Sequence, residues 1–187
     1  MRILISGSSG LIGTAIAAAL APDGHTIQRL VRPGTKSQPR TGDVRWDPTS
    51  GELDAGAAEG ADAVVNLAGA SIGEGRWTAA RKELLRASRI DSTRHLVRAL
   101  GKLQKPPRAF LSASAVGYFG DRGDEELTEE SPAGGDFLAT LCKDWEAEAA
   151  AAANFGARTA CMRFGIVLAC DGGALPRMVL PFKFGAG

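Results

Sequence analysis

The 187-residue sequence has few cysteines, and they form no pattern that would support a covalent or metal-based scaffold. Its three cysteines are Cys142, Cys161 and Cys170, and their spacing is not that of metal ligands or of a disulfide framework. This excludes a disulfide-rich secreted scaffold and a zinc site, and no metal is expected. We interpret the three side chains as small buried apolar groups of a protein in a reducing compartment.

The sequence also lacks an excess of charge of one sign and any long apolar run. Lys and Arg number 22 against 21 Asp and Glu, which gives a net charge of +1. This balance offers no electrostatic attraction to nucleic acid or to an acidic membrane surface. No apolar run is long enough to span a bilayer, and the first residues have the pattern of a strand rather than of a signal peptide. We therefore expect a cytoplasmic protein that partners neither nucleic acid nor a membrane.

What the sequence does contain is an apolar strand that leads directly into three glycines. The apolar run Ile3–Ile5 is followed by the glycine triplet, and an alanine-rich helical pattern continues over 14–20. Glycine permits a tight turn and close backbone approach, and a helix N-terminus offers N–H groups and a positive dipole end to phosphates. Because the triplet stands between a strand and a helix, it predicts a dinucleotide pyrophosphate site. The residues expected at this site are Gly7, Ser8, Ser9, Gly10, Leu11, Ile12 and Gly13.

Strand-like apolar runs alternate with helical patterns along nearly the whole chain. Strands are expected at 26–31, 44–46, 63–67, 109–112 and 159–164, and helices at 78–103 and 137–153. Continuous apolar strands separated by helices predict a parallel sheet covered by helices on both faces, with about six strands in all. The expected fold is therefore α/β, a doubly wound parallel sheet (a Rossmann fold) spanning 1–187, with ligands at the carboxyl ends of its strands.

The end of the second strand bears on the choice between NAD and NADP. In a dinucleotide fold, an acidic residue at this place binds the ribose 2′-hydroxyl, whereas an Arg accommodates a 2′-phosphate. Here the strand ends in Leu30-Val31-Arg32, with no acidic residue in reach. Arg32 therefore favours NADP, with Lys36 as a second cation from the following loop. The alternative interpretation is a solvent-facing Arg at a strand end.

At this point the chain resembles the extended and atypical short-chain dehydrogenase/reductase superfamily. Within it, the sequence is most similar to the NAD(P)-binding "epimerase family" of nucleoside-diphosphate-sugar epimerase-like proteins. The likeness covers essentially the whole chain. It is carried by the glycine triplet together with Arg32, Asn66-Leu67-Ala68-Gly69, Arg76-Trp77, Ser88-Arg89, Ser112 to Gly120, Leu141-Cys142, Trp145-Glu146, Arg163 to Leu168 and Gly172-Gly173.

The resemblance implies further contacts with the cofactor. Leu67, Ala68 and the adjoining Gly69 would pass under its adenosine and diphosphate, although these positions also fit a buried strand end. Arg89 would reach the cofactor from the other side, and Val167 would touch the nicotinamide end.

The resemblance includes two further residue pairs whose roles it does not define. The pair Arg76-Trp77 fits a substrate-side clamp and a helix-entry anchor equally well. We interpret Trp145-Glu146 as a packing feature rather than as chemistry.

The catalytic pattern of the superfamily is incomplete in this sequence. Its enzymes use a Tyr as general acid/base, a Lys four residues later that lowers the Tyr pKa, and a Ser that positions the substrate. Ser114 stands at the place expected for the Ser and is the candidate catalytic residue. Lys143 lies on the expected helix, but Ala139 precedes it by four residues, and the single tyrosine, Tyr118, lies in the loop after the Ser. The general acid/base therefore has no candidate.

The resemblance also implies a C-terminal substrate-binding part of about a hundred residues. We interpret 172–187 as the start of that region, with the remainder absent from this sequence. The leading functional hypothesis is an NADP-dependent oxidoreductase or a sugar-nucleotide-epimerase-type enzyme acting on an unidentified small molecule. The alternatives are a non-catalytic NADP-binding sensor or scaffold, and an incomplete domain without activity. A homo-oligomer is compatible with each of these hypotheses.

Overall fold

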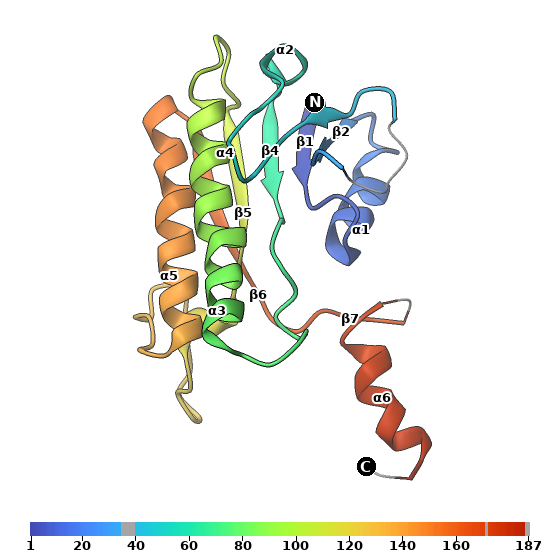
Figure 1. Cartoon of the computed structure of the whole chain (residues 1–187), viewed down its shortest axis with the longest axis vertical. Helices are drawn as coiled ribbons and strands as arrows, with labels where there is room; N and C mark the ends of the chain where they lie inside the picture. Colours follow the sequence, from blue (N-terminus) through green and yellow to red (C-terminus); the bar gives the residue numbers. More distant parts are fainter. Residues whose placement is uncertain (35–39, 171, 186–187) are drawn as a thin grey trace.

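A computed structural model describes residues 1–34, 40–170 and 172–185 of the chain. Its centre is a six-stranded parallel sheet (Figure 1). The sheet has the strand order β3-β2-β1-β4-β5-β6, and each neighbouring pair is parallel. This is the order of a Rossmann sheet, so the predicted fold class is confirmed. The strands are β1 (Arg2–Ser6), β2 (Thr26–Val31), β3 (Val44–Arg45), β4 (Ala63–Asn66), β5 (Ala109–Ala115) and β6 (Arg158–Phe164).

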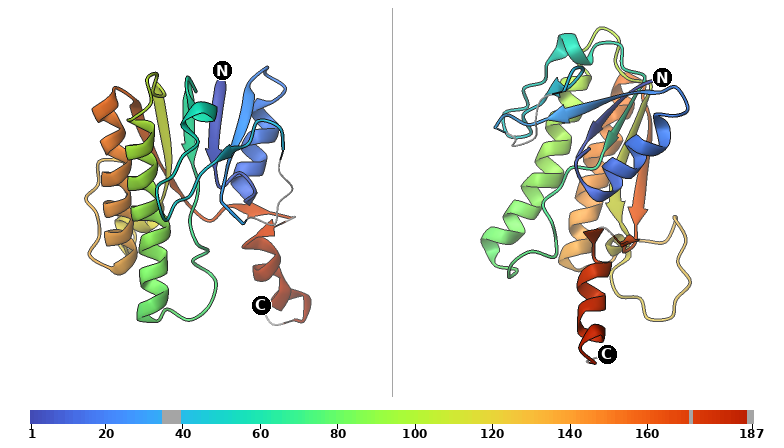
Figure 2. Two further views of the ribbon diagram at one scale, coloured as in Figure 1. Left: turned by 45° about the horizontal axis from the view of Figure 1, so that its top comes forward. Right: turned by 90° about the vertical axis from the view of Figure 1, so that its right-hand side faces the viewer.

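Helices cover both faces of the sheet (Figures 1 and 2), which explains why nearly all residues of its central strands β1 and β4 are buried. Helix α1 (Leu11–Leu20) lies on one face and packs against Ile3 and Ile5 of β1. The other face is covered by α3 (Ala79–Arg86), α4 (Ser92–Leu100) and α5 (Phe137–Ala150). Leu4, the residue between the two isoleucines, packs into the core on this second face. The one-turn helix α2 (Ala55–Ala58) precedes β4.

The long helix predicted over 78–103 is continuous but not uniform. Between α3 and α4 the chain forms a π-helical turn, η1 (Ala87–Asp91). A π-turn inserts extra backbone into the helix, so it rotates the side chains that follow relative to those before it. Such turns are frequent at functional sites, and η1 carries Ser88 and Arg89.

Two glycines fix the turn between β1 and α1. Gly7 has φ +74°, and a Cβ there would lie 2.9 Å from the carbonyl carbon of Leu67. A Cβ on Gly13 would lie 2.4 Å from the carbonyl oxygen of Gly7, which is far below van der Waals contact. Any side chain at either position would therefore push the loop after β1 away from α1 or from the loop after β4.

The predicted strand 109–112 extends to Ala115, so Ser114 lies inside β5 rather than in the loop that follows. Two 3₁₀ turns, η2 (Val116–Phe119) and η3 (Ala151–Phe155), follow β5 and α5. Of the three cysteines, Cys142 is buried and Cys161 partly buried, but Cys170 is exposed, so the prediction that all three are buried is wrong for Cys170.

The last described segment is a small hairpin followed by a helix. Strands β7 (Leu168–Ala169) and β8 (Gly172–Gly173) pair antiparallel, and α6 (Leu175–Lys183) follows. Helix α6 has no buried residue and projects from the body of the molecule (Figure 1). Among the described residues, no helix has both the length and the apolar character needed to cross a membrane.

Candidate functional site

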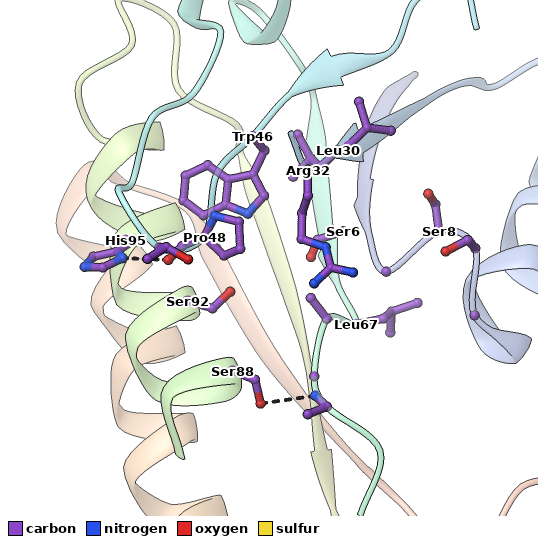
Figure 3. A pocket seen from close by; sticks show the side chains of 18 of the residues that line it. Ser6, Ser8, Leu30, Arg32, Trp46, Pro48, Leu67, Ser88, Ser92 and His95 are labelled. Carbon is purple, nitrogen blue, oxygen red and sulfur yellow. Dashed lines mark hydrogen bonds between the residues drawn. The ribbon is translucent and has the colours of Figure 1, made fainter. Parts of the chain in front are cut away.

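A cleft of about 650 Å³ opens at the carboxyl ends of β1, β2 and β4 (Figure 3). Its volume is within the usual range for a small-molecule or cofactor site. One wall is the edge of the helix that runs from α3 to α4, and the opposite wall is the glycine loop. The predicted cofactor residues that line it are Gly7, Ser8, Ser9, Gly10, Arg32, Leu67, Ala68 and Gly69.

Five other predicted cofactor residues are not among those that line the cleft. Leu11, Ile12 and Gly13 form the first turn of α1, directly behind the glycine loop. Val167 lies between β6 and β7 and is 39% exposed, while Arg89 is buried behind the cleft wall.

The glycine loop presents the N-terminus of α1 to the cleft. Gly10 is the N-cap residue of α1, and because it has no side chain it cannot cap the first helical turn. The first N–H groups of a helix have no partner within the helix, so here they are left for solvent or a ligand. Together with the positive end of the helix dipole, they make this part of the cleft suited to a phosphate.

Arg32 follows β2 and points into the cleft. In Figure 3 its guanidinium lies between the glycine loop near Ser8 and the segment that contains Trp46 and Pro48. Arg32 is exposed and has no ion-pair partner among the residues that the structure describes. It is therefore a cation available to an anionic ligand. Lys36, its predicted helper, lies outside the described residues.

A second arginine at the cleft, Arg29, is held by an acidic residue. Its Nε and Nη2 donate to the Asp43 carboxylate at 2.7 and 2.5 Å. The hydrogen bonds from Arg29 hold the pKa of Asp43 below its ordinary value, so the carboxylate stays ionised. The pair links β2 to the residue that directly precedes β3.

Arg89 is a buried cation beside the cleft floor. Only 8% of the residue is exposed, and its Nη2 donates to the carbonyl oxygen of Ala70 at 3.0 Å. A Cβ on Gly69 would lie 3.1 Å from the Arg89 Cζ, so the missing side chain of Gly69 leaves room for the guanidinium. Burial lowers the pKa of Arg89, and no carboxylate pairs with it in the described part of the chain. The guanidinium therefore lies directly behind Gly69 and Ala70, two residues that line the cleft.

Ser114 is engaged in a charged network at the end of β5. The residue is 3% exposed, and its hydroxyl donates to Glu146 Oε1 at 2.6 Å. Arg163 donates to both Glu146 oxygens, each at 2.9 Å, and its guanidinium lies over the Tyr118 ring at 3.6 Å. Burial raises the pKa of Glu146, but the hydrogen bonds from Arg163 and Ser114 outweigh it, so the net shift is downward. Glu146 is therefore a firmly ionised carboxylate.

The face of α5 that meets Ser114 differs from the one expected. Lys143 is exposed and Ala139 is buried, so this i, i+4 pair does not face the Ser. Cys142 and Glu146, which are also four residues apart, face it instead. Trp145 packs in the core as expected and donates from Nε1 to Thr93 at 2.9 Å. The interpretation of Glu146 as a packing residue is wrong, because its carboxylate organises a polar network.

The structure also bears on the Arg76-Trp77 pair. The Trp77 indole donates to the carbonyl oxygen of Ile72 at 3.2 Å and packs edge-on against Phe137, with 5.7 Å between ring centroids. These contacts tie the loop before α3 to the start of α5. They favour the helix-entry anchor over the substrate clamp.

Comparisons with known proteins identify the family of this chain. The model of the NAD dependent epimerase/dehydratase family matches residues 3–180. The epimerase family protein ML0860 of Mycobacterium leprae is 42% identical over 185 residues, which cover 99% of this chain and 59% of that protein. The human epimerase family protein SDR39U1 is 36% identical, with 100% of this chain and 61% of that protein covered. The chain thus spans 59% to 61% of the length of these relatives.

Two solved structures are similar along nearly the whole chain. The nucleoside-diphosphate sugar epimerase from Corynebacterium glutamicum has a TM-score of 0.82 and 38% identity, and covers 98% of this chain and 38% of its own. The structure of human SDR39U1 with NADPH has a TM-score of 0.83 and 34% identity, and covers 100% of this chain and 61% of its own. The chain belongs to the NAD dependent epimerase/dehydratase family, within the short-chain dehydrogenase/reductase superfamily of NAD(P)-binding proteins.

Proposed function

We propose that this chain binds NADP(H) in the cleft at the end of β1 and prefers it to NAD(H). The observation that carries the proposal is the position of Arg32, which points into the cleft beside the glycine loop and has no acidic partner in the described residues. A 2′-phosphate is the group that distinguishes the two cofactors, and an arginine at this strand end is its usual partner. The NADPH bound to human SDR39U1 supports the same choice.

The residues present fit such a cofactor. The close contacts at Gly7 and Gly13 leave no space for side chains where a diphosphate must approach the backbone. In the proposed complex the diphosphate lies at the N-terminus of α1 near Gly10, and the 2′-phosphate lies on Arg32. Leu67, Ala68 and Gly69 support the cofactor from the end of β4, Arg89 supplies positive potential through the wall at Gly69, and Val167 lies toward the nicotinamide.

For the reaction, we propose hydride exchange of the oxidoreductase or sugar-nucleotide-epimerase type. A bound nicotinamide ring accepts or donates a hydride. Ser114 is the candidate for holding a substrate hydroxyl. Because its own proton is directed to Glu146, its oxygen is left to accept a hydrogen bond rather than to donate one.

The second candidate function is a non-catalytic NADP-binding sensor or scaffold. The α5 side chains that face Ser114 are a thiol and a carboxylate, and neither supplies the phenol and ammonium pair on which the superfamily relies. A protein of this kind would bind the cofactor tightly and pass the difference between NADPH and NADP⁺ to a partner.

Two experiments separate the candidates. Sugar nucleotides, alcohols and carbonyl compounds are screened with NADP⁺ or NADPH while the nicotinamide absorbance is followed, and Ser114→Ala is the test variant. Turnover that is lost in Ser114→Ala, with NADPH binding kept, supports the enzyme. Cofactor binding without turnover across the panel counts against it. Identical capture of partners by the NADPH-bound and NADP⁺-bound protein would exclude the sensor.

A further inference from the structure

One edge of the helix from η1 to α4 lines the upper part of the cleft. Ser92 and His95 face the segment that follows β3, which contains Trp46 and Pro48 (Figure 3), and Asp91 also lines the cleft. His95 Nδ1 lies 2.8 Å from the carbonyl oxygen of Pro48, a bond in which the ring nitrogen must be the donor. This hydrogen bond fixes the spacing between the helix and the segment after β3. The result is a slot beside Arg32 with apolar surface on one side and polar groups on the other.

Ser92 carries a hydroxyl that makes no hydrogen bond to the residues that the structure describes. The residue is 5% exposed, and its Oγ points into the cleft (Figure 3). Its neighbours on the helix are satisfied: Ser88 Oγ donates to Leu85 and accepts from Ala70, and Thr93 accepts from Asn66 and Trp145. No bond of this kind is made by Ser92 within the described ranges. Ser92 Oγ is not one of the fully buried side-chain atoms, so it is accessible from the cleft, where it can bond a ligand.

Asp91 adds a hydrogen-bond acceptor next to Ser92. Its Oδ1 accepts from Arg94 Nη1 at 2.8 Å, and Arg94 is shared with Glu148, which lies 2.9 and 2.7 Å from its Nε and Nη2. Arg94 thus forms ion pairs with two carboxylates, those of Asp91 and Glu148. The Oδ2 of Asp91 has no partner in the part of the chain that the structure describes, and the residue lines the cleft.

An ionised carboxylate accepts only, whereas a serine hydroxyl both donates and accepts. The pair is therefore complementary to an exocyclic amino group that stands beside a ring nitrogen with a free lone pair. Adenine carries these two groups at N6 and N1. Hypoxanthine carries an oxygen and an N–H at the same positions, and its oxygen would face the Asp91 carboxylate.

We propose that Asp91 and Ser92 read the nucleobase of the bound dinucleotide and select a 6-aminopurine. This inference rests on the proposed function, since it places the adenosine end in the slot beside Arg32. The flat base would lie against Pro48 and Trp46, with its amino edge toward the helix.

The test compares NADPH with its hypoxanthine analogue, reduced nicotinamide hypoxanthine dinucleotide phosphate, by calorimetric titration. We expect the unaltered chain to bind NADPH at least about tenfold more tightly than the analogue. In Asp91→Asn this ratio falls to about threefold or less, because an amide can donate to the oxygen of hypoxanthine. Asp144→Asn is the matched control, because Asp144 also pairs with an arginine, Arg86, but does not line the cleft. It should leave the ratio unchanged.

A second readout does not depend on the analogue. Ser92→Ala removes a hydroxyl that has no partner among the described residues, so the thermal unfolding temperature without cofactor should be nearly unchanged. The stabilisation that saturating NADPH provides should nevertheless be smaller than in the unaltered chain. A lower unfolding temperature without cofactor, or an undiminished stabilisation by NADPH, would show that Ser92 serves the fold alone.

The two proposals fail in different ways. Tight NADPH binding with a ratio near one overturns base reading by Asp91 and Ser92 but leaves the proposed NADP site intact. If neither NADPH nor NADH binds, the proposed function fails and this inference fails with it.

Discussion

The hydroxyl of Ser114 in β5 donates a hydrogen bond to the carboxylate of Glu146 in α5, with 2.6 Å between the two oxygens. Arg163 in β6 donates two hydrogen bonds to the same carboxylate. Three elements of the fold therefore meet at one charged group. The partly buried carboxylate is compensated on both sides, which makes it important for stability as well as for the orientation of Ser114.

Replacing Glu146 by Gln should destabilise the protein by about 2 kcal/mol, because a charged hydrogen-bond acceptor is lost and Arg163 keeps its charge without a counter-ion. Urea unfolding at neutral pH measures the change. Glu83→Gln is the control, because Glu83 is exposed on α3 and its replacement should change the free energy of unfolding by no more than about 0.5 kcal/mol. Equal unfolding midpoints for the two variants would contradict the account of the network.

The contribution of Glu146 should depend on pH. Since its pKa in the folded chain is below the ordinary value of 4.5, the folded state binds the proton less readily than the unfolded state does. Its stabilisation is therefore fully present above the unfolded pKa and is lost as the pH falls through the folded pKa. The difference in unfolding free energy between the unaltered chain and Glu146→Gln should be constant at neutral pH and shrink below about pH 4.5. A difference that stays the same through this range would exclude an ionised Glu146 as the cause.

The glycine triplet allows a matched pair of substitutions. A Cβ on Gly13 would lie 2.4 Å from the Gly7 carbonyl oxygen, whereas a Cβ on Gly10 would lie 3.3 Å from it. Gly13→Ala should therefore cost about 2 kcal/mol or more and weaken NADPH binding at least about tenfold. Gly10→Ala should cost less than about 1 kcal/mol. If the two variants unfold at the same urea concentration, the close approach at Gly13 is not what holds the turn.

Arg89 can be tested with one half of the cofactor. Arg89→Met removes the positive charge behind Gly69. It should weaken NADPH binding by about tenfold, since the Coulomb attraction between a nearby buried cation and a bound phosphate is of this order. Adenosine 2′,5′-bisphosphate, which would occupy the Arg32 end, should bind the variant about as well as the unaltered chain. Equal losses for both ligands would indicate a change in the fold, and unchanged NADPH binding would remove Arg89 from the cofactor site.

The fold and the place of the cleft beside the glycine loop could be predicted from the sequence because both depend on local patterns. Apolar runs bounded by turns define the strands, and strand, glycine triplet and helix follow one another within residues 2–20. Arg32 could be placed for the same reason, since it directly follows β2.

The network at Ser114 could not be predicted in the same way. Glu146 is 32 residues away from Ser114 in the sequence, and their contact depends on how α5 is rotated about its axis. If the orientation of α5 is misjudged by one residue, Lys143 is expected to face β5, whereas in the structure Cys142 does. The π-turn η1 has a similar effect on the α4 side chains, because it moves Asp91 and Ser92 relative to the face that a regular helix predicts.

The most direct test of the central claim is the ratio of the dissociation constants of NADH and NADPH, measured by calorimetric titration of the unaltered chain, Arg32→Ala and Arg98→Ala. Arg98 is exposed on α4 and does not line the cleft, so its variant controls for net charge. The account predicts a ratio of at least about ten, or about 1.4 kcal/mol, in the unaltered chain and in Arg98→Ala, and a ratio near one in Arg32→Ala. A ratio near one in the unaltered chain, or one that survives in Arg32→Ala, would contradict it.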